Sequence, residues 1–401
     1  MDKIVRFGAR LLLLATLLVV PLQSYWVRIA ERADWADKPF FWLIVWYEPL
    51  VLLILLLSVA CFRQLKIVLT KLDWLFVAVL LYTLASYFWA DHSASYHIIG
   101  LRHSLPLIYF YFLTRIAQPT DRAIDRVLGV TFWVVVLVGL VQAALIVAGQ
   151  TNLLEALQLP VRQYVGTFPR VESTLPGPNQ FSTYLVLMLL ILQFRPIRGR
   201  DWLTIGGIPL LLLSFSRSAL LGFLAAGLAY LGLDRTGRAK QVAWLTACLL
   251  LLGVGVTLLR GLSIQDLVFH GQSTPEHASA FSVALDKIQA GSPLQLLIGH
   301  GAGESGPATF VRTQSFIPEN WFLQVVYEYG LIGLGLFVAL FVAAATVSIR
   351  LKEYLVALAV LAILVNSFFL HPLSDNMPGA FLLALMIGLL GNRLAAKGVD
   401  A

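Results

Sequence analysis

Charged residues and cysteine are both scarce in this sequence. Only 13% of the 401 residues are Asp, Glu, Lys or Arg, and two are cysteine. The cysteines, Cys61 and Cys248, lie in separate apolar stretches, so we expect neither a disulfide nor a cysteine metal site. Hydrophobic residues make up 59% of the chain, which is more than a soluble core of this length requires. The composition therefore argues against a soluble domain and indicates a polytopic membrane protein.

Long apolar stretches recur along the whole chain. Most of them can cross a hydrocarbon layer about 30 Å thick as a helix of about 20 residues. They predict an all-α fold of about twelve transmembrane helices, in a single transmembrane domain over residues 1–401. The stretches are residues 8–28, 41–62, 73–90, 97–114, 128–148, 181–194, 202–216, 219–233, 242–259, 321–349, 354–370 and 378–392.

Basic residues gather at alternate ends of these stretches. By the positive-inside rule those ends are cytoplasmic, so both termini are expected inside, and the net charge of +7 indicates no nucleic-acid partner. Two long loops then lie outside, at residues 149–180 and 260–320, and the second is expected to form a lid with a short helix over 282–290. The basic groups are in residues 3–10, 63–71, 115–126, 195–200, 235–240, 350–352 and 393–397.

Four charged residues fall within the predicted spans, at similar depths below the outer surface. They are Glu48, Arg102, Arg217 and Glu328. A charge in the hydrocarbon layer costs about 2.5–3.5 kcal/mol, so such residues are functional candidates and usually have partners. Because positively and negatively charged residues share this depth, the sequence predicts a polar cavity that opens to the outer side.

The strongest anion-site candidate is Arg217, which the serines Ser216 and Ser218 flank. The spans 202–216 and 219–233 are too short to cross the membrane fully, so the tip between them is expected below the outer surface. A guanidinium with hydroxyls and free helix N–H groups suits a phosphate. The alternative is an arginine that pairs with Glu48 or Glu328 and only holds helices together.

Two further arginines are weaker anion candidates. Arg102 either binds an anion or pairs with Glu48, whose neighbour Pro49 is expected to kink that helix. Arg170 precedes a Pro/Gly turn that ends at Asn179, the expected N-cap of the next helix. Without further support, Arg170 is most simply a solvated loop charge.

A carboxylate and an amide, Glu319 and Asn320, lie where the large loop returns to the membrane, before the sequence Gly330-Leu331-Ile332-Gly333. Glu319 can accept a proton from a sugar hydroxyl, or it can simply favour the dipole of the following helix. His300 and Arg312 lie in the same loop, but the histidine spacing fits no familiar zinc pattern, so we expect no metal.

Together these motifs resemble the O-antigen ligase and O-antigen polymerase superfamily of bacterial envelope glycosyltransferases. The resemblance rests on the number of spans, the Ser216-Arg217 hairpin tip, Arg170 before Pro178-Asn179, the late loop with Gly299-His300-Gly301, and the segment from Glu319 to Gly333. It implies a GT-C-like enzyme of the bacterial inner membrane whose active site faces the periplasm.

The resemblance also implies the reaction and the roles of the residues. A metal-independent transferase without a cofactor would move a glycan from undecaprenyl pyrophosphate to a sugar hydroxyl. By position, Arg217, Arg102 and Arg170 would hold the pyrophosphate, with Arg217 also stabilising the leaving group. Glu319 would activate the acceptor. Asn320, His300, Glu48, Glu328 and Arg312 are secondary candidates.

One position departs from the ligase pattern. Ligases look like His-Asn, nine residues, then Gly-x-x-Gly, whereas this chain has Glu319 in place of that histidine. The departure favours a polymerase, whose acceptor is another lipid-linked repeat unit, over a ligase, whose acceptor is lipid A core. A flippase or other transporter of lipid-linked glycans remains a third alternative, although transporters usually place polar residues near the midplane.

Overall fold

The computed structural model describes most of the chain, with gaps. The described residues are 2–32, 47–60, 65, 67–90, 93–159, 161, 164–165, 168–233, 273–311, 316–375 and 377–398.

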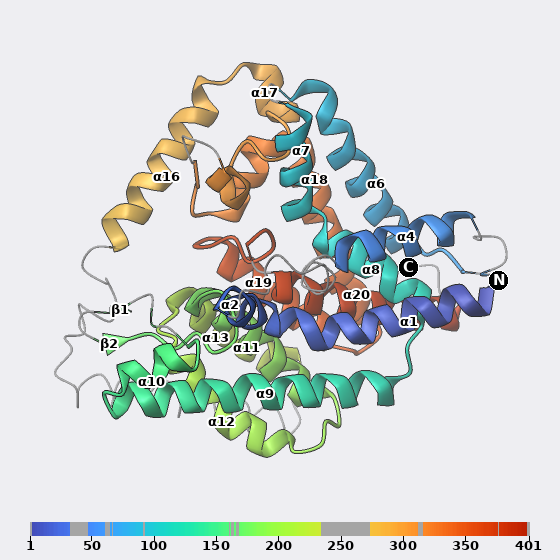
Figure 1. Ribbon diagram of the computed structural model, residues 1–401. Coiled ribbons are helices and arrows are strands. Elements are labelled where there is room, and N and C mark those ends of the chain that lie inside the picture. Colours follow the sequence, from blue (N-terminus) through green and yellow to red (C-terminus); the bar gives the residue numbers. More distant parts are fainter. Residues whose placement is uncertain are drawn as a thin grey trace. The chain divides into compact units, whose positions relative to one another are not determined.

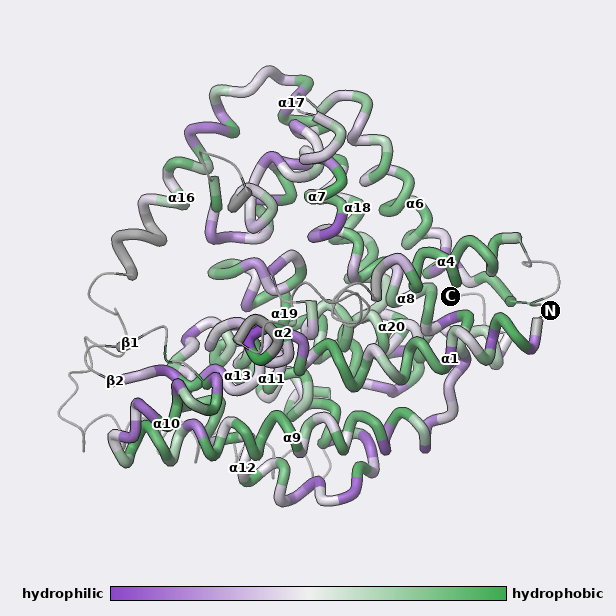
Figure 2. The backbone as a smooth tube through the Cα atoms, in the orientation of Figure 1, coloured by the Kyte–Doolittle hydropathy of each residue, from purple (hydrophilic) through white to green (hydrophobic). Residues whose placement is uncertain are grey.

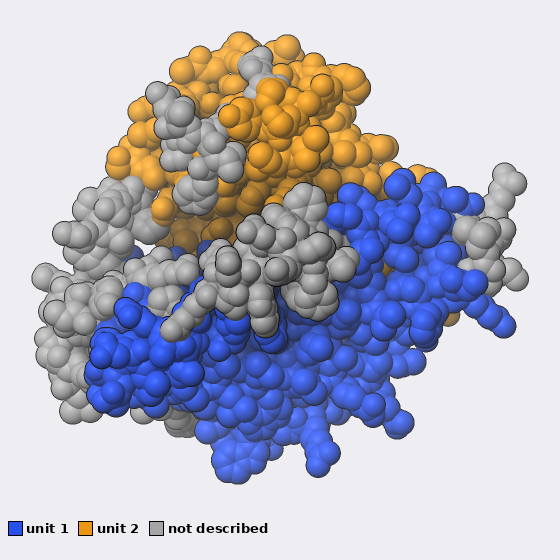
Figure 3. All heavy atoms as spheres, in the orientation of Figure 1, with its two compact units in different colours: residues 1–67, 116–270 blue, residues 68–115, 271–401 orange. Residues whose placement is uncertain are grey.

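The chain divides into two compact units, which Figure 3 shows in different colours. Unit 1 comprises Met1–Ile67 and Ile116–His270, and unit 2 comprises Val68–Arg115 and Gly271–Ala401. Each unit is therefore built from two separate stretches of sequence, and each is described by itself.

The secondary structure is almost entirely helical and strongly apolar (Figure 2). Among the described residues, 5 helices are long and apolar enough to cross a membrane, with several shorter apolar helices beside them. This agrees with a polytopic membrane protein. The predicted number of about twelve spans is not established, and the predicted span at 242–259 lies outside the described residues. The long helices are Lys3–Ile29, Lys71–Trp89, Asp121–Val147, Trp321–Arg350 and Met377–Lys397.

Unit 1 is organised around the long helix α9 (Asp121–Val147), which packs against α1 (Asp2–Val19) and α12 (Arg200–Leu213) (Figure 1). Helix α11 packs against both α12 and α13 and is buried along most of its length. The other elements of unit 1 are η1 (Val20–Leu22), α2 (Gln23–Arg32), α4 (Tyr47–Ala60), α10 (Thr151–Ala156), β1 (Tyr164–Val165), β2 (Phe168–Pro169), α11 (Pro178–Phe194) and α13 (Arg217–Leu233).

Unit 2 is organised around α18 (Trp321–Arg350), which packs against α6, α17 and α19 (Figure 1). The single span predicted over 97–114 is in fact two helices, because Pro106 interrupts the backbone bonding and α8 starts there. The short helix predicted over residues 282–290 is the C-terminal part of a longer helix, α16 (Ser273–Ala290). The other elements are α6 (Lys71–Ala85), η2 (Ser86–Trp89), α7 (Ala94–Ser104), α8 (Pro106–Ala117), α16 (Ser273–Ala290), α17 (Pro293–Ile298), η3 (Gly306–Val311), α19 (Leu355–Ser367) and α20 (Met377–Lys397).

Helix α18 is broken at Gly330, where φ is 66° and ψ is −173°. The break frees backbone carbonyls, and the segment after α17 bonds to them. The N–H of His300 donates to the Tyr327 carbonyl at 2.9 Å, and the N–H of Gly301 donates to the Glu328 carbonyl at 2.8 Å. The predicted turn at Gly299-His300-Gly301 is therefore docked on the broken helix.

A buried ion pair in unit 2 was not anticipated. Arg115 is 2% exposed, and its Nε lies 2.8 Å from Oδ1 of Asp73, which is 1% exposed. Tyr111 donates to the same oxygen at 2.7 Å, and Asp73 also closes a capping box with Thr70 at the start of α6. The sequence placed Arg115 only in a basic group at the end of an apolar stretch, and it does not show that the side chain turns inward onto Asp73 of α6.

Asp73→Asn is expected to destabilise the protein by about 3–5 kcal/mol, because it leaves the Arg115 charge buried without its counter-charge. The change can be measured as the free energy of unfolding in detergent micelles. Glu353→Gln is the matched control. It removes the partner of Arg393 in an ion pair that is 41% and 26% exposed, and should cost less than about 1 kcal/mol. If both variants lowered the free energy of unfolding equally, the Asp73–Arg115 pair would not stabilise the protein more than the exposed pair does.

Candidate functional site: the break between α12 and α13

The predicted interruption between two apolar helices is present in unit 1. Helix α12 ends at Leu213 and α13 begins at Arg217, with Ser214, Phe215 and Ser216 between them. Phe215 adopts a φ of 50°, which L-residues rarely occupy. Strained backbone of this kind tends to occur at functional sites, where the surrounding structure maintains it.

The serine hydroxyls lie close together at this break. Ser214 donates its Oγ hydrogen to the Leu211 carbonyl at 2.6 Å and accepts from the Ser216 N–H at 3.4 Å. The Oγ atoms of Ser216 and Ser218 are 3.4 Å apart, and the two residues are 2% and 8% exposed. The first turn of α13 thus combines hydroxyls, helix N–H groups and the Arg217 guanidinium, the donor set that suits an anion.

Arg170 is held against the same break and is not a solvated loop charge. Its Nε donates to the Ser214 carbonyl at 2.7 Å, and its Nη2 donates to Oδ1 of Asn179 at 2.7 Å. Burial, and then the positive charge of Arg217, lower the pKa of Arg170 from 12.5 to about 10. A buried arginine whose charge is disfavoured by a neighbouring cation forms, with that cation, a site that an anion would stabilise. We call Arg170 and Arg217 the arginine pair.

Buried polar contacts fix the backbone that carries Arg170. The N–H of Val171 donates to the Leu213 carbonyl at 3.1 Å. Oε1 of Gln142 on α9 accepts from the N–H groups of Glu172 and Ser173, at 3.0 and 2.8 Å. Arg28 of α2 forms an ion pair with Glu172 at 3.2 Å. The expected N-cap at Asn179 was wrong: α11 begins at Pro178, and the side-chain Oδ1 of Asn179 accepts from Arg170.

Arg170→Lys is expected to make the site sensitive to pH. A lysine has an ordinary pKa of about 10.4, and the same burial and neighbouring charge would lower that pKa toward the neutral range. The variant should therefore bind an anionic ligand at about pH 6.5 and lose that binding as the pH rises through its folded pKa, because the cation is then neutralised. The wild type keeps its charge up to about pH 10. Binding of inorganic pyrophosphate measured across this range, with Arg198→Lys as an exposed control, tests the expectation, and parallel profiles would refute it.

The predicted catalytic carboxylate lies in unit 2, directly before α18. Glu319 is half-buried and has a φ of 54°, again an unusual conformation for an L-residue. Asn320 is the N-cap of α18: its Oδ1 accepts from the Leu323 N–H at 3.0 Å and its Nδ2 donates to the Phe368 carbonyl at 3.0 Å. The N-cap of α18 is therefore Asn320, and Glu319 directly precedes it, where its charge can still favour the helix dipole.

Glu328 of α18 is 2% exposed and is held by polar groups of unit 2. Its Oε1 accepts from the Ser305 N–H at 3.2 Å, the Ser305 hydroxyl at 3.3 Å and Gln324 Nε2 at 3.5 Å. Among the described residues of unit 2, Glu328 makes no ion pair, and its pairing with Arg217 of unit 1 stays an untested alternative.

The remaining candidates are less informative. His300 stacks on Tyr327 and contacts its carbonyl through Nδ1 at 3.0 Å, which makes it part of the docked turn. Arg102 lies in the last turn of α7 with its side chain exposed. Arg312 and the side chain of Glu48 lie outside the described part of the chain.

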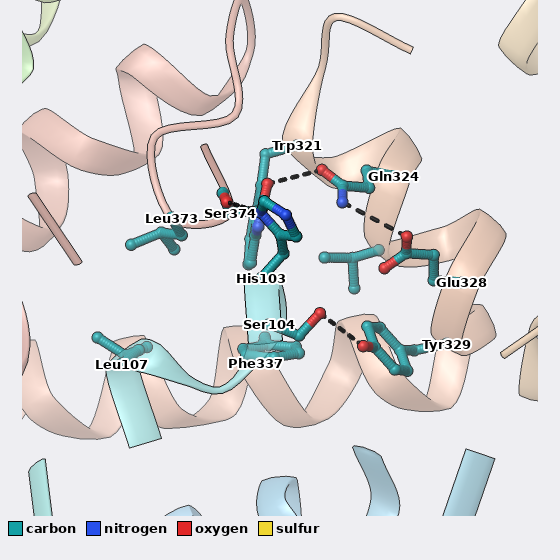
Figure 4. Close-up of a pocket in the computed structure, with 11 residues that line it drawn as sticks. His103, Ser104, Leu107, Trp321, Gln324, Glu328, Tyr329, Phe337, Leu373 and Ser374 are labelled. Carbon is teal, nitrogen blue, oxygen red and sulfur yellow. Dashed lines mark hydrogen bonds between the residues drawn. The ribbon is translucent and has the colours of Figure 1, made fainter. Parts of the chain in front are cut away.

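Unit 2 contains a small cavity beside Glu328, with polar groups set among a largely apolar lining. The cavity has a volume of about 20 Å³ and is lined by Glu328, Gln324, His103, Ser104 and Ser374, among others (Figure 4). Asn320, Gln324 and Glu328 recur at intervals of four residues and so share one face of α18, a periodicity that could have indicated it. Over the described ranges, no cluster of three or more potential metal-ligating side chains occurs.

No protein-family model matches the sequence, and no curated protein matches it significantly.

Proposed function

We propose that this protein is a membrane-embedded glycosyltransferase that moves a glycan from undecaprenyl pyrophosphate to a sugar hydroxyl on the periplasmic side of the bacterial inner membrane. The favoured reaction is polymerisation of O-antigen or other surface polysaccharide repeat units. The resemblance of the sequence motifs suggested this reaction, and the arginine pair is the structural observation that carries it.

The arginine pair suits a pyrophosphate for electrostatic reasons. Arg170 is anchored through Nε and Nη2, in a setting whose burial and neighbouring Arg217 disfavour its charge. A diphosphate would neutralise both cations, and the serine hydroxyls and N–H groups at the start of α13 would add donors. An arginine that served only to join helices would not need a second cation beside it.

The proposed reaction uses these cations to stabilise the leaving group. The acceptor hydroxyl oxygen attacks the anomeric carbon of the donor glycan, and the bond from that carbon to the pyrophosphate oxygen breaks. Negative charge then develops on undecaprenyl pyrophosphate, where Arg217 and Arg170 oppose it. A general base receives the hydroxyl proton, and the sequence motif alone assigns this role to Glu319.

Glu319→Gln is expected to lower the rate of transfer by about 10²–10⁴-fold, because the amide cannot accept the acceptor proton. Donor binding should change little. Single-turnover kinetics and a separate donor-binding assay measure the two effects, with Glu304→Gln in the same unit as the control. Unchanged turnover in Glu319→Gln would remove this residue from the chemistry.

The function is tested with purified protein in lipid and undecaprenyl-pyrophosphate-linked repeat units, first alone and then with added lipid A core. A ladder of products without lipid A core identifies a polymerase. Product that forms only with the core identifies a ligase, in which Glu319 replaces the usual histidine. Binding of lipid-linked glycan with no product in either assay would refute the transferase proposal and favour a transporter.

A further inference from the structure

The cavity beside Glu328 has a different character from the anion site, because the deeply buried carboxyl of Glu328 makes no ion pair among the described residues of unit 2. Three donors approach one oxygen of this carboxyl, Oε1. Within the described residues of unit 2, no lysine or arginine lies within ion-pair distance of it. An isolated carboxylate in a membrane interior is costly, so such a group is expected to bind a proton or a small cation.

His103 faces the same cavity from another helix. Its Nδ1 lies 2.9 Å from the Ser374 carbonyl, which fixes this nitrogen as the N–H donor of the neutral ring. The other nitrogen, Nε2, is then a proton acceptor. Figure 4 shows His103 and Glu328 pointing into the cavity from different helices, α7 and α18.

The cavity has room for one water molecule. Its volume of about 20 Å³ exceeds the roughly 10–15 Å³ that a water needs. The carboxyl of Glu328, the ring of His103 and the hydroxyls of Ser104 and Ser374 provide polar partners. A water in this cavity would connect Glu328 to His103.

We propose that Glu328, His103 and a single water form a proton-binding site inside unit 2. The proton on a carboxyl oxygen of Glu328 passes to the water, while a proton of the same water passes to Nε2 of His103. The products are a carboxylate, a water and an imidazolium, so atoms and charge balance. This site is independent of the proposed transferase activity.

The lining favours a proton over a metal cation. Hard cations take six or more oxygen ligands. Here Oε1 of Glu328 already accepts three hydrogen bonds, the Ser374 hydroxyl donates to Gln324 and the Ser104 hydroxyl accepts from Tyr329. The histidine ring would also supply nitrogen instead of oxygen.

Several other titratable groups lie on the elements around Glu328. Of these, only His103 and Tyr329 line the same cavity, so variants of the others serve as controls. The groups are Tyr82 on α6, His103 on α7, Tyr329 on α18, His300 and Glu304 in the segment after α17, and His371 and Asp375 in the segment before α20.

Infrared difference spectroscopy of the full-length protein in lipid tests the proposal. Between about pH 5 and pH 9, the wild type should show the C=O stretching band of a protonated carboxylic acid that diminishes as the pH rises. Glu328→Gln should lose this band and Glu304→Gln should keep it. Gln324→Leu should shift its frequency by removing a hydrogen bond to Oε1, which keeps the assignment testable if Glu328→Gln does not fold.

The role of His103 has its own readout. In His103→Gln the band should remain, but its hydrogen–deuterium exchange should slow about 100-fold, because the proton acceptor is lost. An unchanged exchange rate would overturn the relay. Absence of any acid band that responds to Glu328 or Gln324 would overturn the proton site, and stabilisation by Na⁺ that disappears in Glu328→Gln would replace it with a cation site.

Discussion

Arg217→Ala is expected to lower the rate of glycan transfer by about 10²–10³-fold while the protein remains folded in the membrane. The physical reason is that Arg217 opposes charge that develops on the leaving pyrophosphate, and a preorganised donor of this kind typically contributes a factor of this size. Arg217→Lys should recover part of the rate, because it restores the charge but not the planar fork that binds two phosphate oxygens. The measurement is single-turnover transfer from undecaprenyl-pyrophosphate-linked glycan.

Arg198→Ala provides the control for charge removal. Arg198 is an exposed arginine of unit 1, just before α12, and its loss should leave the rate unchanged. Donor binding should weaken in Arg217→Ala, since the ground-state diphosphate also contacts the guanidinium in this proposal. Full activity in Arg217→Ala would exclude the arginine pair as the pyrophosphate site, whatever the protein catalyses.

Gly330→Ala is expected to destabilise unit 2 by more than about 3 kcal/mol. Gly330 has a φ of 66° and a ψ of −173°, a region of backbone space that essentially only glycine occupies. A Cβ at this position would lie 2.2 Å from the Leu297 carbonyl oxygen and 2.5 Å from the Ile298 nitrogen. These are backbone atoms that a side-chain rotation cannot move away. The docked turn at residues 299–301 should therefore detach or α18 should rearrange.

Gly335→Ala in the same helix is the matched control. No atom lies within 4 Å of the Cβ it would add, and its backbone is helical. Alanine there should stabilise the helix by about 0.5–1 kcal/mol. Thermal unfolding in detergent or lipid, together with proteolysis between α17 and α18, would compare the variants. Similar stability of Gly330→Ala and the wild type would mean that the break in α18 does not require glycine.

Local sequence patterns predicted the features that depend on local chemistry. Apolar stretches predicted membrane-type helices, because hydrocarbon requires every backbone group to bond within the helix. The two short spans predicted the break before Arg217, since neither had the length to cross alone. Pro106, however, divided a predicted single span, and Asn179 turned out to bind Arg170, because the fold provided a partner that the local capping pattern did not show.

Contacts between distant parts of the chain decided the rest. Asp73 and Arg115 are 42 residues apart, and nothing near either of them indicates that they pair. Arg170 resembled a solvated loop residue until its contact with the Ser214 carbonyl, 44 residues away, placed it beside Arg217. The cavity beside Glu328 likewise combines residues of α7, α18 and the segment before α20.

The sequence by itself determined that the chain is an apolar helical protein, and it singled out Arg217 and Glu319, because hydrophobic length and the cost of a buried charge are properties of single segments. Only the tertiary structure decided which buried charges have partners. That outcome depends on which helices pack together, and therefore on the whole fold. In the folded protein Arg115 pairs with Asp73, and Arg170 lies near the second cation, Arg217. Glu328 accepts hydrogen bonds and lines a cavity.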